Sequence, residues 1–227
     1  MSARPPSLRR QRGFSLIEIA IVLVIVGLMI GGLVTPLTVQ LEQRKVAETQ
    51  KALDEAKEAL TGYALRYGYL PCPAISAVNG LEDRRGGRCN GDKRVGFLPW
   101  ATLGLRQGDS WDKLFRYSVT PAFSDSEQLF NLGTPRDISI VTRNGGPLLQ
   151  ATALNDIPAM IMSHGKNGFG ATSVQGQRQA VAAGNNVDER SNAASSNIYI
   201  SRPASGAQQP GGEFDDIVVW LSPNLLF

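Results

Sequence analysis

The sequence has one histidine and only two cysteines among 227 residues, and this scarcity restricts the chemistry that it can support. Structural zinc sites and cytosolic redox centres usually need several cysteine and histidine ligands, which His164, Cys72 and Cys89 do not supply. The Gly-x-Ser-x-Gly motif of many hydrolases is missing as well. Since no group of residues assembles a credible active site, we expect a protein that is not an enzyme.

The glycine-rich stretch 165–170 lacks the spacing of a phosphate-binding loop, because Lys166 directly follows its first glycine. We therefore expect a surface turn there. His164 precedes this turn and could act as a general base, but a lone histidine in such a place more commonly forms a hydrogen bond or faces solvent.

A strong excess of one charge is missing from most of the chain. The formal net charge is +3, but four arginines lie in the first thirteen residues, and the rest of the chain carries 19 basic and 20 acidic side chains. A body so balanced has no electrostatic footprint for nucleic acid, and no specific nucleic acid is predicted as a partner. Five basic residues between positions 84 and 94 leave a local DNA contact open as an alternative.

One long run of the chain has no charge at all. Residues 19–41 are dominated by isoleucine, valine and leucine, and as a helix they are long enough to cross a hydrocarbon layer of about 30 Å. An ordinary secretory signal has a shorter apolar run and a cleavage site of small residues after it. The sequence therefore predicts a helix that lies in the membrane at least transiently and that is not an ordinary secretory signal.

The residues before this run carry a specific motif. A short polar leader ends at Gly13 and is followed by Phe14, Ser15, Leu16, Ile17 and Glu18. This arrangement resembles the class III signal of type IV prepilins. The resemblance implies that prepilin peptidase cuts between Gly13 and Phe14 and methylates the new amine, so that residues 1–13 are a leader peptide. The alternative is an uncleaved signal anchor, in which Gly13 only begins the helix and Glu18 lies at the membrane interface.

Glu18 needs a physical reason, because a carboxylate in a bilayer costs at least a few kcal/mol and is usually paired with a cation. Cleavage would create such a cation at the α-amino group of Phe14. In the family that the motif resembles, the glutamate pairs with this amine in a neighbouring subunit and sets the register of the filament, which implies an assembly role for Glu18.

An amphipathic pattern continues directly from the apolar run. We expect one helix over residues 14–67, about 80 Å long at 1.5 Å per residue, with residues 14–41 as its membrane-spanning part. Its second half has apolar residues at alternating spacings of three and four, which predicts a stripe that covers a globular domain. The stripe consists of Val46, Thr49, Leu53, Ala56, Leu60, Tyr63 and Tyr67. The alternative interpretation of this stripe is a soluble coiled coil. In the apolar half of the helix, Gly27, Gly31 and Pro36 predict a kink or a stretch without helical structure.

The rest of the chain predicts a small antiparallel β-sheet. Residues 68–110 are rich in glycine, proline and charge and are expected to form loops, while residues 111–227 form the head, with a polar surface insertion at about 171–212. Five short runs have strand composition. They are 114–119, 138–142, 158–162, 197–201 and 217–221. The predicted fold class is therefore α+β and pilin-like, a long helix packed on a sheet.

The two cysteines lie in the loop region. In a chain that is exported, Cys72 and Cys89 predict a disulfide. By closing the loop between them, this bond would stabilise the folded state by about 3 kcal/mol in the chain-entropy model. A metal site is the weaker interpretation, because His164 is far away in sequence.

The head also resembles that of type II secretion pseudopilins, in which a glycine-rich loop and an Asp-bearing terminal strand lie together. The stretches that carry this resemblance are 163–170 and 214–220. It implies a structural calcium site, in which Asp215 and Asp216 give carboxylates, Asn167 gives an amide oxygen and the glycine turns give carbonyls. Apart from this implied calcium, the sequence indicates no cofactor.

Asp188 or Glu189 could provide a further ligand to this site. Those pseudopilins usually carry an acidic residue where this chain has Asn167. The alternative is that Asp216 faces water and Asp215 caps a turn.

These features together predict a minor pilin or pseudopilin, a structural subunit of a type IV pilus-like or type II secretion filament. Its expected partners are prepilin peptidase, other pilin or pseudopilin subunits and the inner-membrane assembly platform. It would sit in the bacterial inner membrane as a single-pass protein and then enter a periplasmic or cell-surface filament. The alternative is a signal-anchored periplasmic domain that binds a ligand or acts as an enzyme.

Overall fold

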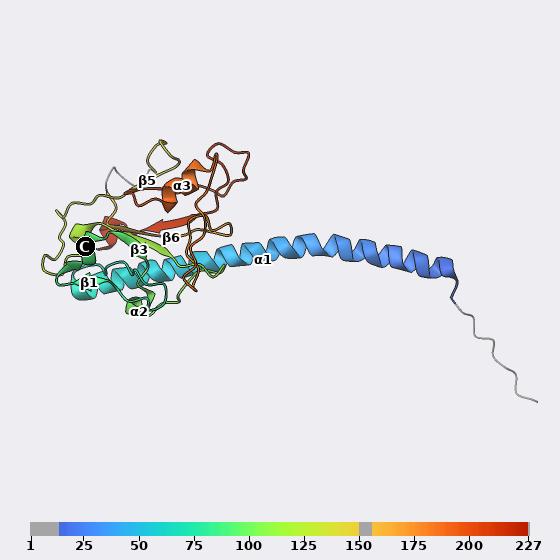
Figure 1. Ribbon diagram of the computed structural model, residues 1–227, viewed down its shortest axis with the longest axis horizontal. Helices are drawn as coiled ribbons and strands as arrows, with labels where there is room; N and C mark the ends of the chain where they lie inside the picture. Colours follow the sequence, from blue (N-terminus) through green and yellow to red (C-terminus); the bar gives the residue numbers. More distant parts are fainter. Residues whose placement is uncertain (1–13, 150–155, 227) are drawn as a thin grey trace, which may run out of the picture. The chain divides into compact units, whose positions relative to one another are not determined.

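The computed structural model describes residues 14–149 and 156–226, and for residues 30–36 it describes the backbone alone. The chain divides into two compact units, residues 1–44 and 45–227. One helix, α1 (Leu16–Tyr67), belongs to both, and Figure 1 shows it in blue and cyan. Its bounds agree closely with the helix expected over residues 14–67, and it continues through Pro36.

The first unit contains the apolar half of α1. Its large side chains are exposed, among them Leu16 (89%) and Leu23 (66%). Within the residues whose positions are described, no helix is long and apolar enough to cross a membrane. The predicted span, residues 19–41, includes residues 30–36, whose side chains lie outside the described part.

The second unit is built on a four-stranded antiparallel sheet. Its order is β3 (Val95–Phe97), β4 (Arg116–Val119), β6 (Ala159–Ser163) and β8 (Ile217–Trp220). The α+β fold class is therefore confirmed. The expected loop region 68–110 contributes a strand of this sheet, β3, together with the short hairpin of β1 (Arg84–Arg85) and β2 (Arg88–Cys89).

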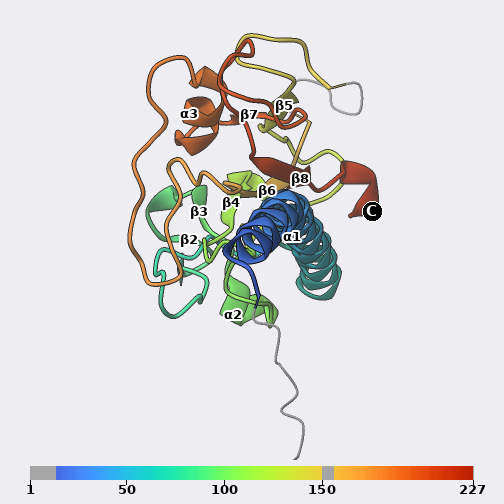
Figure 2. The same ribbon diagram turned by 90° about the vertical axis from the view of Figure 1, so that its right-hand side faces the viewer.

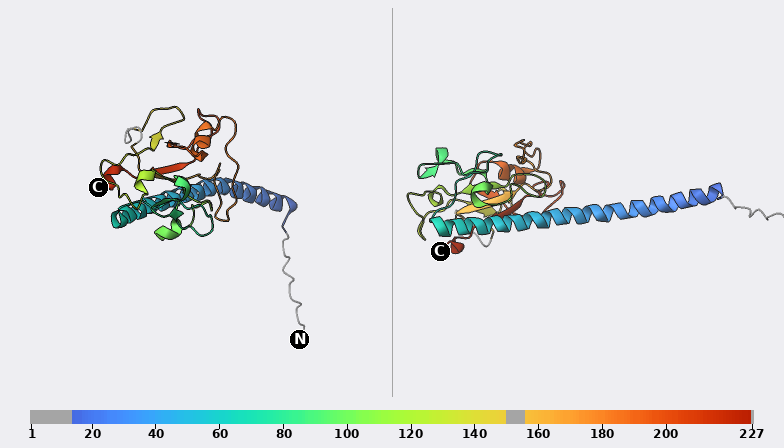
Figure 3. Two further views of the ribbon diagram at one scale, coloured as in Figure 1. Left: turned by 60° about the vertical axis from the view of Figure 1, so that its left-hand side comes forward. Right: turned by 90° about the horizontal axis from the view of Figure 1, so that it is seen from below.

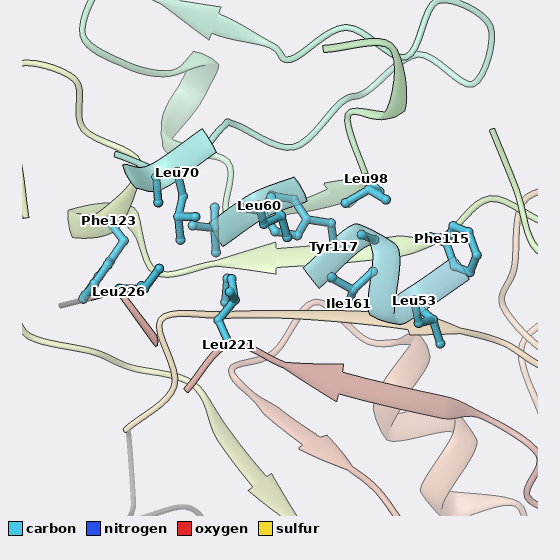
Figure 4. Close-up of a cluster of buried hydrophobic side chains, with 14 of the residues drawn as sticks. Leu53, Leu60, Leu70, Leu98, Phe115, Tyr117, Phe123, Ile161, Leu221 and Leu226 are labelled. Carbon is cyan, nitrogen blue, oxygen red and sulfur yellow. The ribbon is translucent and has the colours of Figure 1, made fainter. Parts of the chain in front are cut away.

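Both faces of this sheet are covered, because its apolar residues alternate between them. Ile161 of β6 packs with Leu53 and Leu60 of α1, as Figure 4 shows. Met160 and Met162 point to the other face and pack with Ile140 and Tyr199. The stripe expected on α1 is confirmed for its central residues, but Val46, at its start, is 44% exposed. The buried face of the helix also includes small residues that the expected stripe left out. Those small residues are Ala52 and Ala64.

A separate pair of strands lies on the second face. β5 (Ser139–Val141) and β7 (Ile198–Ile200) pair in parallel, and Figure 2 shows them with α3 (Val187–Ala193) across the sheet from the α1 segment of this unit. All five runs with strand composition contain a strand. The expectation that they form one antiparallel sheet is wrong for β5 and β7, which pair with each other in parallel. Their central residues, Ile140 and Tyr199, pack with the methionines on the face of the four-stranded sheet rather than extending its edge.

The remaining helical segments are short. They are α2 (Trp100–Leu103), η1 (Asn90–Asp92), η2 (Pro121–Phe123) and η3 (Pro223–Leu225). A disulfide joins Cys72 to Cys89, with the Cα atoms 5.3 Å apart, and connects the segment after α1 to β2.

Candidate functional site

The start of α1 is held by two reciprocal hydrogen bonds. The backbone N–H of Ser15 donates to Oε2 of Glu18 at 2.8 Å, and the N–H of Glu18 donates to Oγ of Ser15 at 3.2 Å. The carbonyl of Ser15 accepts the bond from the N–H of Ile19 that begins the helix. This is a capping box, which satisfies backbone donors that a helix start otherwise leaves unpaired.

The capping box gives Glu18 a local role that the sequence analysis missed. The signal was present, since Ser15 and Glu18 have the Ser-x-x-Glu spacing. In an uncleaved anchor, Glu18 would therefore still have this capping function. Phe14 lies directly before the helix and is 83% exposed, whereas Gly13 lies outside the described residues.

A second site lies in the head, where three carboxylates meet. Glu189 comes from α3, and Asp215 and Asp216 directly precede β8. One carboxylate oxygen of each lies within 4.8 Å of the others. The structure therefore brings the two predicted aspartates together with Glu189, one of the two further ligands considered. Figure 3 shows α3, in orange, next to the red strand β8.

Each carboxylate is held by one of its oxygens. Asp215 accepts a hydrogen bond from the backbone N–H of Asn167 at 2.8 Å. Glu189 accepts from the Asn167 side-chain amide at 2.7 Å and from the Asp215 N–H at 3.0 Å. Asp216 accepts from the Asn192 amide at 2.9 Å. Glu189 and Asn192 are three residues apart, so they share one face of α3.

The other oxygen of each carboxylate is buried and has no hydrogen-bond partner among the described residues. Glu189 is 0% exposed and Asp216 is 6% exposed. The interpretation that Asp216 faces water is therefore wrong. Burial raises the pKa of Glu189 to about 7, and it raises the pKa of Asp215 to about 6. The cluster thus holds ionisable groups that are poorly compensated in the absence of a cation.

The predicted ligands from the glycine loop are arranged differently. Asn167 presents its amide nitrogen to Glu189, while its side-chain oxygen accepts a bond from the N–H of Phe169. The carbonyls of Gly165 and Lys166 accept bonds from Nζ of Lys113, at 2.7 and 2.6 Å. Part of the loop is therefore bound by an internal ammonium ion, which nothing in the sequence pattern indicated.

Two other candidates are located by the structure. Asp188 pairs with Arg202 at 2.8 Å and does not belong to the carboxylate cluster. His164 is 2% exposed, with Nδ1 3.6 Å from Oδ1 of Asp216, so it does not face solvent.

The basic group at positions 84–94 is largely paired. Arg84 contacts Glu82, Arg88 contacts Asp125, and Arg94 contacts Asp137. These ion pairs weaken the case for a local DNA contact.

The chain thus combines a capped helix, whose first half has exposed apolar side chains, with a folded α+β head. Comparison with protein families matches residues 8–34 to the prokaryotic N-terminal methylation motif. This motif is the class III signal peptide of type IV pilin-like proteins, and the chain carries it. The motif implies processing by prepilin peptidase and assembly with other pilins. No curated protein and no solved structure matches the chain.

Proposed function

We propose that this chain is a minor pilin or pseudopilin, a structural subunit of a type IV pilus-like or type II secretion filament. The methylation motif at residues 8–34, which opens a long helix, is the observation that carries the proposal. Residues 1–13 are the leader, and cleavage between Gly13 and Phe14 gives the mature N-methylated chain. Residues 14–67 form the spine.

The exposed apolar side chains of the first unit support burial in another medium. A helix with apolar residues on all sides is stable in lipid or among other helices, but is poorly solvated in water. The subunit is first held in the bacterial inner membrane and then moves into a periplasmic or surface filament through the assembly platform. There the helix exchanges lipid for neighbouring helices, while the head gives partner specificity.

The role of Glu18 in assembly can be separated from its role in the capping box. Glu18→Gln keeps a side-chain oxygen for the Ser15 N–H but removes the charge. Glu18→Leu removes both. If Glu18 pairs with the Phe14 amine of a neighbour, both variants are cleaved and stay in the membrane, and both enter filaments at least about tenfold less than the wild type.

Filaments sheared from the native host and quantified by immunoblotting give the measurement. A Gln variant that assembles as well as the wild type, while the Leu variant fails, would assign Glu18 to the helix cap alone. The competing class, a signal-anchored periplasmic domain, predicts that the leader stays attached and that the protein remains outside any filament.

A second function is favoured by the three unpartnered carboxylate oxygens. Glu189, Asp215 and Asp216 form a donor set of oxygens only, which suits a hard cation such as Ca²⁺. Bound calcium would neutralise the cluster and join α3 to the start of β8. The three carboxylates are suitable calcium ligands. Asn167 instead positions two of them, because its backbone N–H donates to Asp215 and its side-chain amide donates to Glu189.

Thermal melting of the full chain in detergent tests the calcium site. Free calcium at about 100 times its dissociation constant adds about 2.7 kcal/mol to the free energy of unfolding, and so raises the melting midpoint relative to excess chelator. The shift should shrink between pH 8 and pH 5.5, because protons compete for Glu189 and Asp215.

Glu189→Gln should abolish the calcium shift, while Glu58→Gln, on an exposed part of α1, should retain it. An identical midpoint in millimolar calcium and in chelator at pH 8 would remove the site without affecting the filament proposal.

A further inference from the structure

A cavity of about 260 Å³ lies beside β3 and β4, and His164 is one of its lining residues. Apolar side chains line part of it, namely Val95, Phe97 and Leu114. Arg116 and Arg178 line another part, with the hydroxyl residues Thr172 and Ser195. Among the lining residues that the structure describes there is no carboxylate, so the cavity combines an apolar wall with two cationic groups.

Arg116 is fixed in the cavity by one end of its guanidinium. Nη2 donates to the carbonyl of Ala194 at 2.7 Å. Nε is buried and has no hydrogen-bond partner in the part of the chain that the structure describes. Burial lowers the pKa of Arg116, and the charge of Arg178 lowers it further, while Tyr199 and Asp216 act in the opposite direction. Arg116 and Arg178 line the same cavity, and Nε of Arg116 is left without a hydrogen bond among the described residues.

Arg178 lines the same cavity and lies at the end of a tight turn. Thr172 and Arg178 form an antiparallel bridge, and the turn between them contains bonds from the N–H of Gly176 to Ser173 and from the N–H of Gln177 to the hydroxyl of Ser173. The carbonyl of Thr172 accepts a bond from the N–H of Leu114, which ties the turn to the segment that leads into β4. The backbone therefore places the exposed Arg178 and the half-buried Arg116 at one cavity.

A cavity lined by two guanidinium groups and no carboxylate favours an anionic ligand, because an anion can form a charge-assisted hydrogen bond with each group. A carboxylate matches the forked geometry of guanidinium groups. The wall formed by Val95, Phe97 and Leu114 suits a ligand whose charge is attached to carbon rather than one that is polar on all sides.

We propose that this cavity binds a small carboxylate with a short apolar group, held by Arg116 and Arg178 and covered on its apolar side by Phe97 and Leu114. This ligand would make the head of the subunit a binding module in addition to a filament component. The inference rests on the head alone and does not depend on cleavage, on filament assembly or on calcium.

Ligand-observed saturation-transfer NMR on the full chain in detergent tests the proposal, with sodium butyrate as the probe and butyramide as its neutral counterpart. Butyrate should bind and butyramide should not. Arg178→Gln should weaken butyrate binding about tenfold or more, because one charge-assisted contact is lost. Arg178 is exposed, so the fold does not depend on it, and an unchanged melting midpoint checks this.

Arg143→Gln is the matched control, since it removes another exposed arginine that lies outside the cavity. It should bind butyrate like the wild type. Equal binding of butyrate and butyramide, equal loss in both arginine variants, or no butyrate binding at tens of millimolar would each overturn the proposal. Binding of inorganic phosphate without butyrate would overturn the assignment to a carboxylate.

Discussion

Single polar side chains hold together the end of the sheet where the carboxylate cluster lies. Lys113 is only 5% exposed, and its ammonium joins the carbonyls of Gly165 and Lys166. Its charge also lowers the pKa of Asp215, against the larger effect of burial. Gly168, with φ +66°, approaches Lys113 so closely that a Cβ would lie 2.4 Å from Nζ. The glycine loop is therefore shaped around this lysine.

Replacement of Lys113 by methionine should destabilise the head. The side chain keeps a similar volume, but the buried carbonyls lose their donor, and we expect the free energy of unfolding to fall by about 3 kcal/mol. Chemical denaturation, followed by the fluorescence of the tryptophans, all of which lie in the second unit, gives the measurement. Lys51→Met is the control, because its side chain is 79% exposed and should change stability by no more than about 0.5 kcal/mol. Equal effects of the two changes would show that the buried ammonium contributes nothing specific.

At the scale of elements, the second half of α1 is the main partner of the sheet. It presents leucine and alanine side chains to one face, so small residues let the helix backbone lie close while Leu53 and Leu60 fill the space. The opposite face of the same sheet is closed by β5 and β7. Two-sided burial explains why β6 consists almost entirely of buried apolar residues.

Two leucines of α1 allow a direct test of this packing. Leu60 is 0% exposed and Leu65 is 70% exposed. Leu60→Ala should lower the free energy of unfolding by about 2–5 kcal/mol, because it leaves a cavity between the helix and the sheet. Leu65→Ala changes the same helix at a solvated position and should stay within about 0.5 kcal/mol. The packing described for the head would be contradicted if Leu65→Ala were the more damaging of the two in equilibrium denaturation.

For the chain as a whole, the first step of the proposed maturation is removal of the leader. Gly13→Arg should leave residues 1–13 attached and prevent entry into filaments, because the peptidase must accommodate a small residue before the bond that it cuts. Gly13→Ala tests size alone and should still be processed. Intact-mass measurement of the chain from the host membrane decides between cleaved and uncleaved forms. A wild-type chain that begins at Met1 or Ser2, or after the apolar run, would exclude the prepilin assignment.

Features that depend on neighbours along the chain could be predicted without the structure. The methylation motif, the bounds of α1 and the positions of all five predicted strands follow from local composition and periodicity. The capping box of Ser15 and Glu18 belongs to the same class, although the assembly interpretation of Glu18 obscured it.

How those elements pack against one another could not be predicted from local patterns. The entry of β3 into the sheet and the parallel pairing of β5 with β7 join segments that are far apart in sequence. The segment 171–212 looked like a surface insertion because it is polar, yet it supplies Glu189 to the carboxylate cluster and Arg178 to the cavity. Polar composition predicts exposure on average, whereas the burial of a particular charge depends on partners that only the fold brings within reach.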